Sequence, residues 1–217
     1  MNPVHHPDEA TLISYASGAL SQVMSLITAA HLEHCAECRA RLRDAERIGG
    51  LLMQQPRDTA VQLRGRAAML ARLDELPSAA LPPLPAHDPS PDLLPTCLQG
   101  HFAASLSEQP WKTLVPGVQR VRARGIRQGN LMLLKIAPGV GLPLHGHRSG
   151  EMTLVLKGSY HDQLGDYRPG DLADLDSDTL HQPIAHREEP CICVLATDAS
   201  LRFQGVIARM LQPIFGI

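Results

Sequence analysis

The chain has 217 residues, a formal net charge of −2 and only 3% aromatic residues. A length of this order holds one large core or two small ones, and the sequence has neither the basic excess nor the aromatic platform typical of nucleic-acid-binding proteins. No apolar run approaches the roughly 20 residues that span a bilayer, and residues 1–6 lack the features of a secretion signal, so we expect a cytoplasmic protein.

The first part of the chain is predicted to be helical. Residues 1–76 carry apolar positions at helical spacing and contain no alternating runs, which indicates a small all-α domain. The spacing predicts four helices, over about 9–20, 21–34, 37–52 and 59–76, with Ser21 capping the second. On the third helix we expect an inward stripe of Leu42, Ala45, Ile48 and Leu52. The fourth helix carries an apolar set that fits either core packing or a partner-docking face: Met69, Leu70, Leu73 and Leu76.

A possible metal site lies at the end of the second predicted helix. His31, Cys35 and Cys38 form the motif H-x3-C-x2-C, in which one helical turn separates the imidazole from the first thiol. Three ligands that suit Zn²⁺ then converge on one point. His5 or His6, brought back by the first helix, can supply the fourth, and a structural zinc would stabilise a domain too small to bury much apolar surface.

This part of the sequence resembles the zinc-binding anti-sigma domain. The resemblance covers about residues 5–76, including the YASGAL segment at 15–20. The residues of this chain that correspond to the zinc ligands of that family are His6, His31, Cys35 and Cys38. The resemblance implies a helical zinc unit that wraps an alternative sigma factor and blocks RNA polymerase.

A proline-rich segment follows the predicted helices. Residues 77–95 include seven prolines, which remove backbone donors and fix φ, so neither a helix nor a strand ladder can continue through them. We therefore predict a linker at 77–95 between a helical domain at 1–76 and a second domain at 96–217.

Beyond the linker the hydrophobic period changes to two. Alternating runs separated by turn residues predict an antiparallel sandwich or barrel, with strands in about 115–124, 131–137, 152–157 and 192–196. Cys191 and Cys193 share one face of the last of these strands, and we interpret them as small core residues.

The second half also contains a histidine-rich motif. Gly139, His145, His147, Glu151 and Gly158 follow the spacing G-x5-H-x-H-x3-E-x6-G, which matches the first motif of the cupin family. Alternate residues of a strand share one face, so both histidines would point into the barrel. The carboxylate of the glutamate then adds a third ligand.

A fourth ligand is expected further along the chain. The RPGD turn at 168–171 resembles the second cupin motif, and His181 follows it, although the family places its histidine sooner after the glycine and adds a later asparagine that this chain lacks. We prefer His181 to His161 and His186 as the fourth ligand. Three histidines and one carboxylate suit Zn²⁺, Mn²⁺, Fe²⁺ or Ni²⁺.

The order of these features resembles the ChrR-type anti-sigma factors over nearly the whole chain. That resemblance implies two domains, a small all-α zinc-binding bundle followed by an all-β cupin, in a regulator rather than an enzyme. Such a protein would sequester a sigma factor of the extracytoplasmic-function type and release it when singlet oxygen or organic peroxide is sensed through the cupin metal. The alternative is a metal-dependent cupin enzyme, a dioxygenase or isomerase, with an accessory helical domain.

Overall fold

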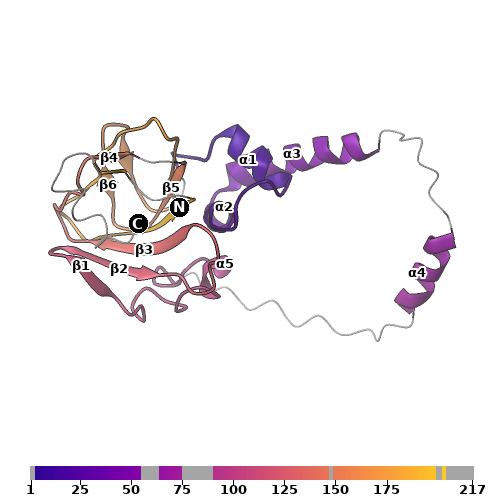
Figure 1. Cartoon of the computed structure of the whole chain (residues 1–217), viewed down its shortest axis with the longest axis horizontal. Helices are drawn as coiled ribbons and strands as arrows, with labels where there is room; N and C mark the ends of the chain where they lie inside the picture. Colours follow the sequence, from indigo (N-terminus) through magenta and orange to yellow (C-terminus); the bar gives the residue numbers. More distant parts are fainter. Residues whose placement is uncertain (1–2, 55–63, 75–89, 147–148, 199–201, 204–217) are drawn as a thin grey trace.

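The computed structural model describes residues 3–54, 64–74, 90–146, 149–198 and 202–203. Helices occupy the first part of the chain and strands the second (Figure 1), as the change of hydrophobic period predicts. None of the described helices has the length and apolar character needed to cross a bilayer.

The first three helices begin at residues whose side chains cap them. Asp8 accepts a hydrogen bond from the backbone of Thr11, and Ser21 accepts one from Met24, which satisfies donors that the first turn of a helix leaves without partners. The cap predicted at Ser21 is thus confirmed. The helices are α1 (Glu9–Ala16), α2 (Gln22–His34), α3 (Ala36–Met53), α4 (Arg64–Asp74) and α5 (Thr96–Gln99).

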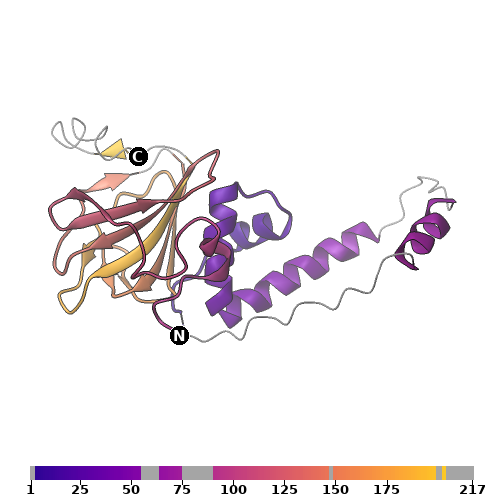
Figure 2. The same cartoon turned by 90° about the horizontal axis from the view of Figure 1, so that it is seen from below.

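The inward stripe predicted for α3 is wrong in its second half. Leu42 is partly buried against α1 and α2, but Ile48 and Leu52 are 59% and 60% exposed. The physical reason is that α3 extends beyond the other helices and leaves its C-terminal turns uncovered (Figure 2). Met69 and Leu70 of α4 are also exposed.

The β part consists of antiparallel sheets. Its main sheet has the strand order β1-β2-β3-β10-β5-β8, and all seven residues of β10 are buried. The strands of this sheet are β1 (Lys112–Val115), β2 (Val118–Arg122), β3 (Asn130–Ile136), β5 (Glu151–Lys157), β8 (Leu172–Leu175) and β10 (Cys191–Thr197). Two smaller sheets are formed by β7 (Asp166–Tyr167), β6 (Tyr160–His161) and β9 (Ile184–Ala185), and by β4 (His145–Gly146) and β11 (Arg202–Phe203).

Both faces of the main sheet are covered. A cluster that includes Ile136, Val155, Tyr160 and Ala185 fills the space between the main sheet and the β7-β6-β9 sheet. This two-layer arrangement confirms the predicted antiparallel sandwich, and it explains why the long central strands are apolar on both sides.

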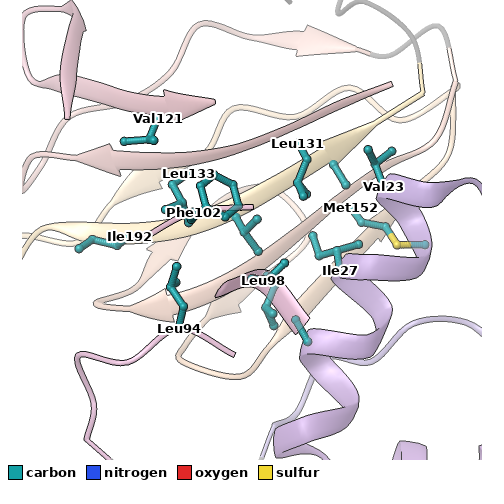
Figure 3. Packing of buried hydrophobic residues seen from close by; sticks show 14 of the residues in the cluster. Val23, Ile27, Leu94, Leu98, Phe102, Val121, Leu131, Leu133, Met152 and Ile192 are labelled. Atoms are coloured by element: carbon teal, nitrogen blue, oxygen red, sulfur yellow. The ribbon is translucent and has the colours of Figure 1, made fainter. Parts of the chain in front are cut away.

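Helix α2 covers the opposite face of the main sheet. Val23 and Ile27 lie beside Leu131, Met152 and Leu98 in one continuous core (Figure 3). The sequence left open whether the helical and β parts touch, and the structure shows that they share this core. The division of the chain into domains at 77–95 stays a prediction, because residues 77–89 lie outside the described residues.

Candidate metal centres

The first candidate centre combines the ligands predicted near the N-terminus. His6, His31, Cys35 and Cys38 each place one ligand atom within 4.8 Å of the other three. His6 Nδ1 lies 3.4 Å from Cys35 Sγ and 3.3 Å from Cys38 Sγ, and His31 Nε2 lies 3.3 Å from Cys38 Sγ. Tetrahedral Zn²⁺ separates such ligand atoms by roughly 3.3–3.8 Å, given Zn–N and Zn–S bonds of about 2.0 and 2.3 Å. The donor set and these three distances therefore fit zinc.

Local sequence explains this convergence. Cys35 ends α2 and begins α3, and its sulfur accepts a hydrogen bond from the backbone of Cys38 in the first turn of α3. His31, one turn before Cys35, is fully buried. His6 arrives from the segment that precedes α1, whereas His5 does not join the cluster. His34 is exposed and does not belong to the cluster.

Burial shifts the pKa values of side chains in this cluster. Burial lowers the pKa of His31 to about 4, so the imidazole is neutral and can coordinate at physiological pH. Burial, reinforced by the neighbouring Cys35 thiol, raises the pKa of Cys38 to about 12. A thiolate is therefore unfavourable in this pocket unless a cation compensates its charge.

Each histidine of the cluster has an outer partner that sets its orientation. His31 Nδ1 lies 2.9 Å from the carbonyl oxygen of Gly170, a contact that requires the proton on Nδ1 and leaves Nε2 for a metal. His6 Nε2 lies 3.5 Å from the carboxylate of Glu37. Because Gly170 belongs to the turn before β8, the orientation of a candidate zinc ligand depends directly on the β part of the chain.

The same turn anchors the N-terminal segment. The buried carboxylate of Asp171 accepts hydrogen bonds from the backbone of Val4 at 2.6 Å, of His5 at 3.0 Å and of Arg168 at 2.8 Å. The backbone of Leu172 donates in turn to the carbonyl oxygen of His5. The segment that delivers His6 is therefore held against β8, the edge strand of the main sheet. Sequence analysis identified this turn only as part of a cupin motif.

The second candidate centre lies between the two layers of the sandwich. His145, Glu151 and His181 are each at most 3% exposed, and their ligand atoms come within 4.8 Å of one another. His145 and His181 exchange reciprocal backbone hydrogen bonds at 3.0 and 3.1 Å. His161 and His186, the rivals of His181, do not belong to this group, and the choice of the fourth ligand stays a prediction. His147, predicted to be a further ligand, lies outside the described residues.

Outer contacts orient these ligands too. His145 Nδ1 lies 2.8 Å from the carbonyl oxygen of Pro143, and His181 Nδ1 lies 2.9 Å from the buried carboxylate of Asp162. Both contacts leave Nε2 for the centre. Burial alone lowers the pKa of His181, but its hydrogen bonds to Asp162 and Glu151 outweigh burial and raise the pKa to about 9. The centre thus has a negative environment that favours a bound cation.

Asp162 is a functional candidate that was not predicted from the sequence. The residue lies just beyond β6, and no spacing relates it to the ligands, so only the pairing of β6 with β9 brings it to His181. A carboxylate that receives the second ring proton of a metal-bound histidine strengthens the ligand and fixes its orientation.

The second centre opens into a mostly apolar pocket. Leu134, Ile136 and Leu195 are among its lining residues, together with the three candidate ligands, Tyr160 and Cys193. Cys193 and its neighbour Cys191 are both buried, as predicted for small core residues. The candidate ligands therefore face a mostly apolar space.

Comparisons with known proteins cover almost the whole chain. A family model described as the ChrR cupin-like domain matches residues 99–200. The anti-sigma-E factor ChrR of Cereibacter sphaeroides is 37% identical over 213 residues, which are 98% of each chain. The crystal structure of Rhodobacter sphaeroides SigE in complex with the anti-sigma ChrR matches with 35% identity and a TM-score of 0.74, covering 90% of this chain and 100% of that one.

Proposed function

This chain belongs to the ChrR family of anti-sigma factors, and from that premise we propose that it holds a sigma factor of the extracytoplasmic-function type and releases it under oxidative stress. Anti-sigma factors are regulators rather than enzymes, so membership in the family argues against the alternative of a dioxygenase or isomerase. The solved complex of a relative with SigE supports a sigma factor as the partner. Since sigma factors act on RNA polymerase, we place this inhibition in the cytoplasm.

The observation that carries the proposal is the exposed apolar end of α3. Ile48, Leu51 and Leu52 are each about three-fifths exposed, and Met53 is 88% exposed. Apolar side chains gathered at such exposure are typical of a surface that a partner covers. Met69 of α4 is 66% exposed, which favours the partner-docking interpretation of that helix over core packing. We assign these two helices to the sigma factor.

Zinc has a structural role in this proposal. Bound by His6, His31, Cys35 and Cys38, Zn²⁺ would join the N-terminal segment to the junction of α2 and α3 and so fix where α3 begins. Zn²⁺ itself has no accessible redox chemistry, which suits a structural role for the N-terminal centre.

The sensor is assigned to the second centre. A divalent metal there, Zn²⁺ or one of Mn²⁺, Fe²⁺ and Ni²⁺, would supply the ligand exchange or redox chemistry that responds to singlet oxygen or organic peroxide. The apolar pocket favours entry of such small molecules. His145, Glu151, His181 and, by prediction, His147 would hold the metal, while Asp162 keeps His181 in the orientation needed to bind.

A short route connects the two centres. Glu151 begins β5 and pairs with Leu175 at the end of β8. Asp171, directly before β8, holds the backbone of His5, the residue before His6. A change in the position of Glu151 can therefore move the strand that orders the zinc ligands. Such a contact, different in the two states of the sensor, is what a signal needs to shift a binding equilibrium.

Co-purification with a candidate sigma factor tests the proposal. Wild-type protein should retain the sigma factor, whereas Cys38→Ser should lose it, because removal of a zinc ligand removes the folding energy linked to the metal. Cys97→Ser is the matched control, because this half-buried cysteine lies outside the candidate centres. Retention of the sigma factor by Cys38→Ser at wild-type strength would contradict the role assigned to zinc.

A further inference from the structure

A third group of metal-binding side chains lies on the small β7-β6-β9 sheet, outside both centres described above. His161, Asp166 and His186 each place one ligand atom within 4.8 Å of the other two. Antiparallel register sets His161 directly opposite Asp166 on one side and opposite Ile184 on the other. His186 follows Ile184 by two residues and so projects on the same side of the sheet. The strand pairing itself assembles the group.

The contacts within this group suit a cation better than a closed hydrogen-bond network. His186 Nε2 lies 2.9 Å from a carboxylate oxygen of Asp166, and the rings of His161 and His186 are 4.9 Å apart between centroids. His161 Nδ1 is buried and has no hydrogen-bond partner among the described residues. A buried polar nitrogen without a partner is destabilising, and a bound metal would provide that partner.

We propose that His161, Asp166 and His186 form a third divalent-metal site that takes Zn²⁺. Two imidazoles and one carboxylate are a donor set that Zn²⁺ accepts, with water completing its coordination. The side chain of Asp166 is 65% exposed and that of His186 is 33% exposed, so the site opens to solvent. The metal here exchanges with the medium, unlike one held by four protein ligands of which three are buried.

Contacts link this site to both other centres. Next to His161 along the chain is Asp162, which orients His181 of the second centre. The carbonyl oxygen of Asp166 accepts a hydrogen bond from His5 Nε2 at 3.1 Å, and His5 precedes the zinc ligand His6. A cation that ties β6, β7 and β9 together therefore stabilises the strands that support both centres.

Zinc titration of the full-length protein tests this site directly. Native mass spectrometry first counts the zinc retained after purification, and isothermal titration calorimetry with ZnCl₂ then measures any further binding. Wild-type protein should bind one additional equivalent, and His161→Gln or His186→Gln should abolish it. The control His101→Gln should bind like wild type, because His101 lies outside all three groups. Unchanged additional binding in both test variants, or none in wild type at millimolar zinc, would overturn the proposal.

Thermal unfolding provides a second measurement. Added Zn²⁺ should raise the melting temperature of wild-type protein and of His101→Gln but not that of His186→Gln. The reason is that a ligand which binds only the folded state stabilises that state, and His186→Gln removes the site. Asp166→Asn, at a mostly exposed position, replaces His161→Gln should that variant fail to fold. An equal rise in wild type and Asp166→Asn would contradict the assignment. The initial zinc count separates this result from any failure at the first two centres.

Discussion

Asp171 should control zinc retention from outside the zinc centre. Its side chain accepts two hydrogen bonds from the N-terminal segment, at Val4 and His5, and one from Arg168 within its own turn. Hydrogen bonds to a charged group contribute about 1.5–3 kcal/mol each, so the two bonds to the segment amount to about 3–6 kcal/mol. Both are only partly buried, and water replaces part of that energy when Asp171→Ala removes them.

We therefore expect Asp171→Ala to weaken zinc binding about 10- to 100-fold, which corresponds to about 1.4–2.8 kcal/mol of this energy at about 1.4 kcal/mol per tenfold change. Zinc transfer to a chromogenic chelator measures this change, and circular dichroism verifies that the variant is folded. Asp171→Asn keeps one acceptor oxygen and should show a smaller effect. Asp178→Ala, at an exposed aspartate after β8, is the control. A folded Asp171→Ala protein that transfers zinc like wild type would refute the anchoring role of this turn.

Three further predictions follow from other parts of the molecule. Asp162→Asn should weaken metal binding at the second centre about 10- to 100-fold in a competition assay, and an unchanged affinity would show that its contact with the histidine is not needed. Ile48→Ser combined with Leu52→Ser should abolish sigma binding in calorimetry. Because both side chains are largely exposed, the double substitution should change the free energy of unfolding by less than about 1 kcal/mol; strong destabilisation would instead indicate a core role. Gly158→Ala should lower the free energy of unfolding by about 1–3 kcal/mol or more in a denaturant titration. The reason is that φ of Gly158 is +67° and a Cβ would lie 2.4 Å from the carbonyl oxygen of Pro190; wild-type stability would contradict the observed turn.

Local spacing was sufficient to predict that three of the four side chains in the first cluster lie together. His31, Cys35 and Cys38 follow from helical geometry, because residues one turn apart face the same point. The choice of His6 over His5 needed the structure, since the path of the N-terminal segment depends on its contacts with the turn before β8. Sequence periodicity carries no information about such long-range contacts.

The sequence likewise did not identify the element that packs against α2. The apolar spacing of Val23 and Ile27 predicts a buried face but cannot say whether helices or a sheet will cover it. Apolar spacing also gave the wrong result for Ile48 and Leu52, because the same spacing occurs whether or not another element covers the face. In both cases periodicity identified an apolar surface without identifying what covers it.

The central claim is that the second metal centre governs release of a sigma factor held by the helices. The most direct test measures the dissociation constant of the sigma complex before and after exposure to photosensitised singlet oxygen, for wild-type protein and for Glu151→Ala. Wild-type protein should lose affinity on exposure, and Glu151→Ala should bind before exposure and retain its affinity afterwards. Equal loss of affinity in the two proteins would contradict the claim, because release would then not require the second centre.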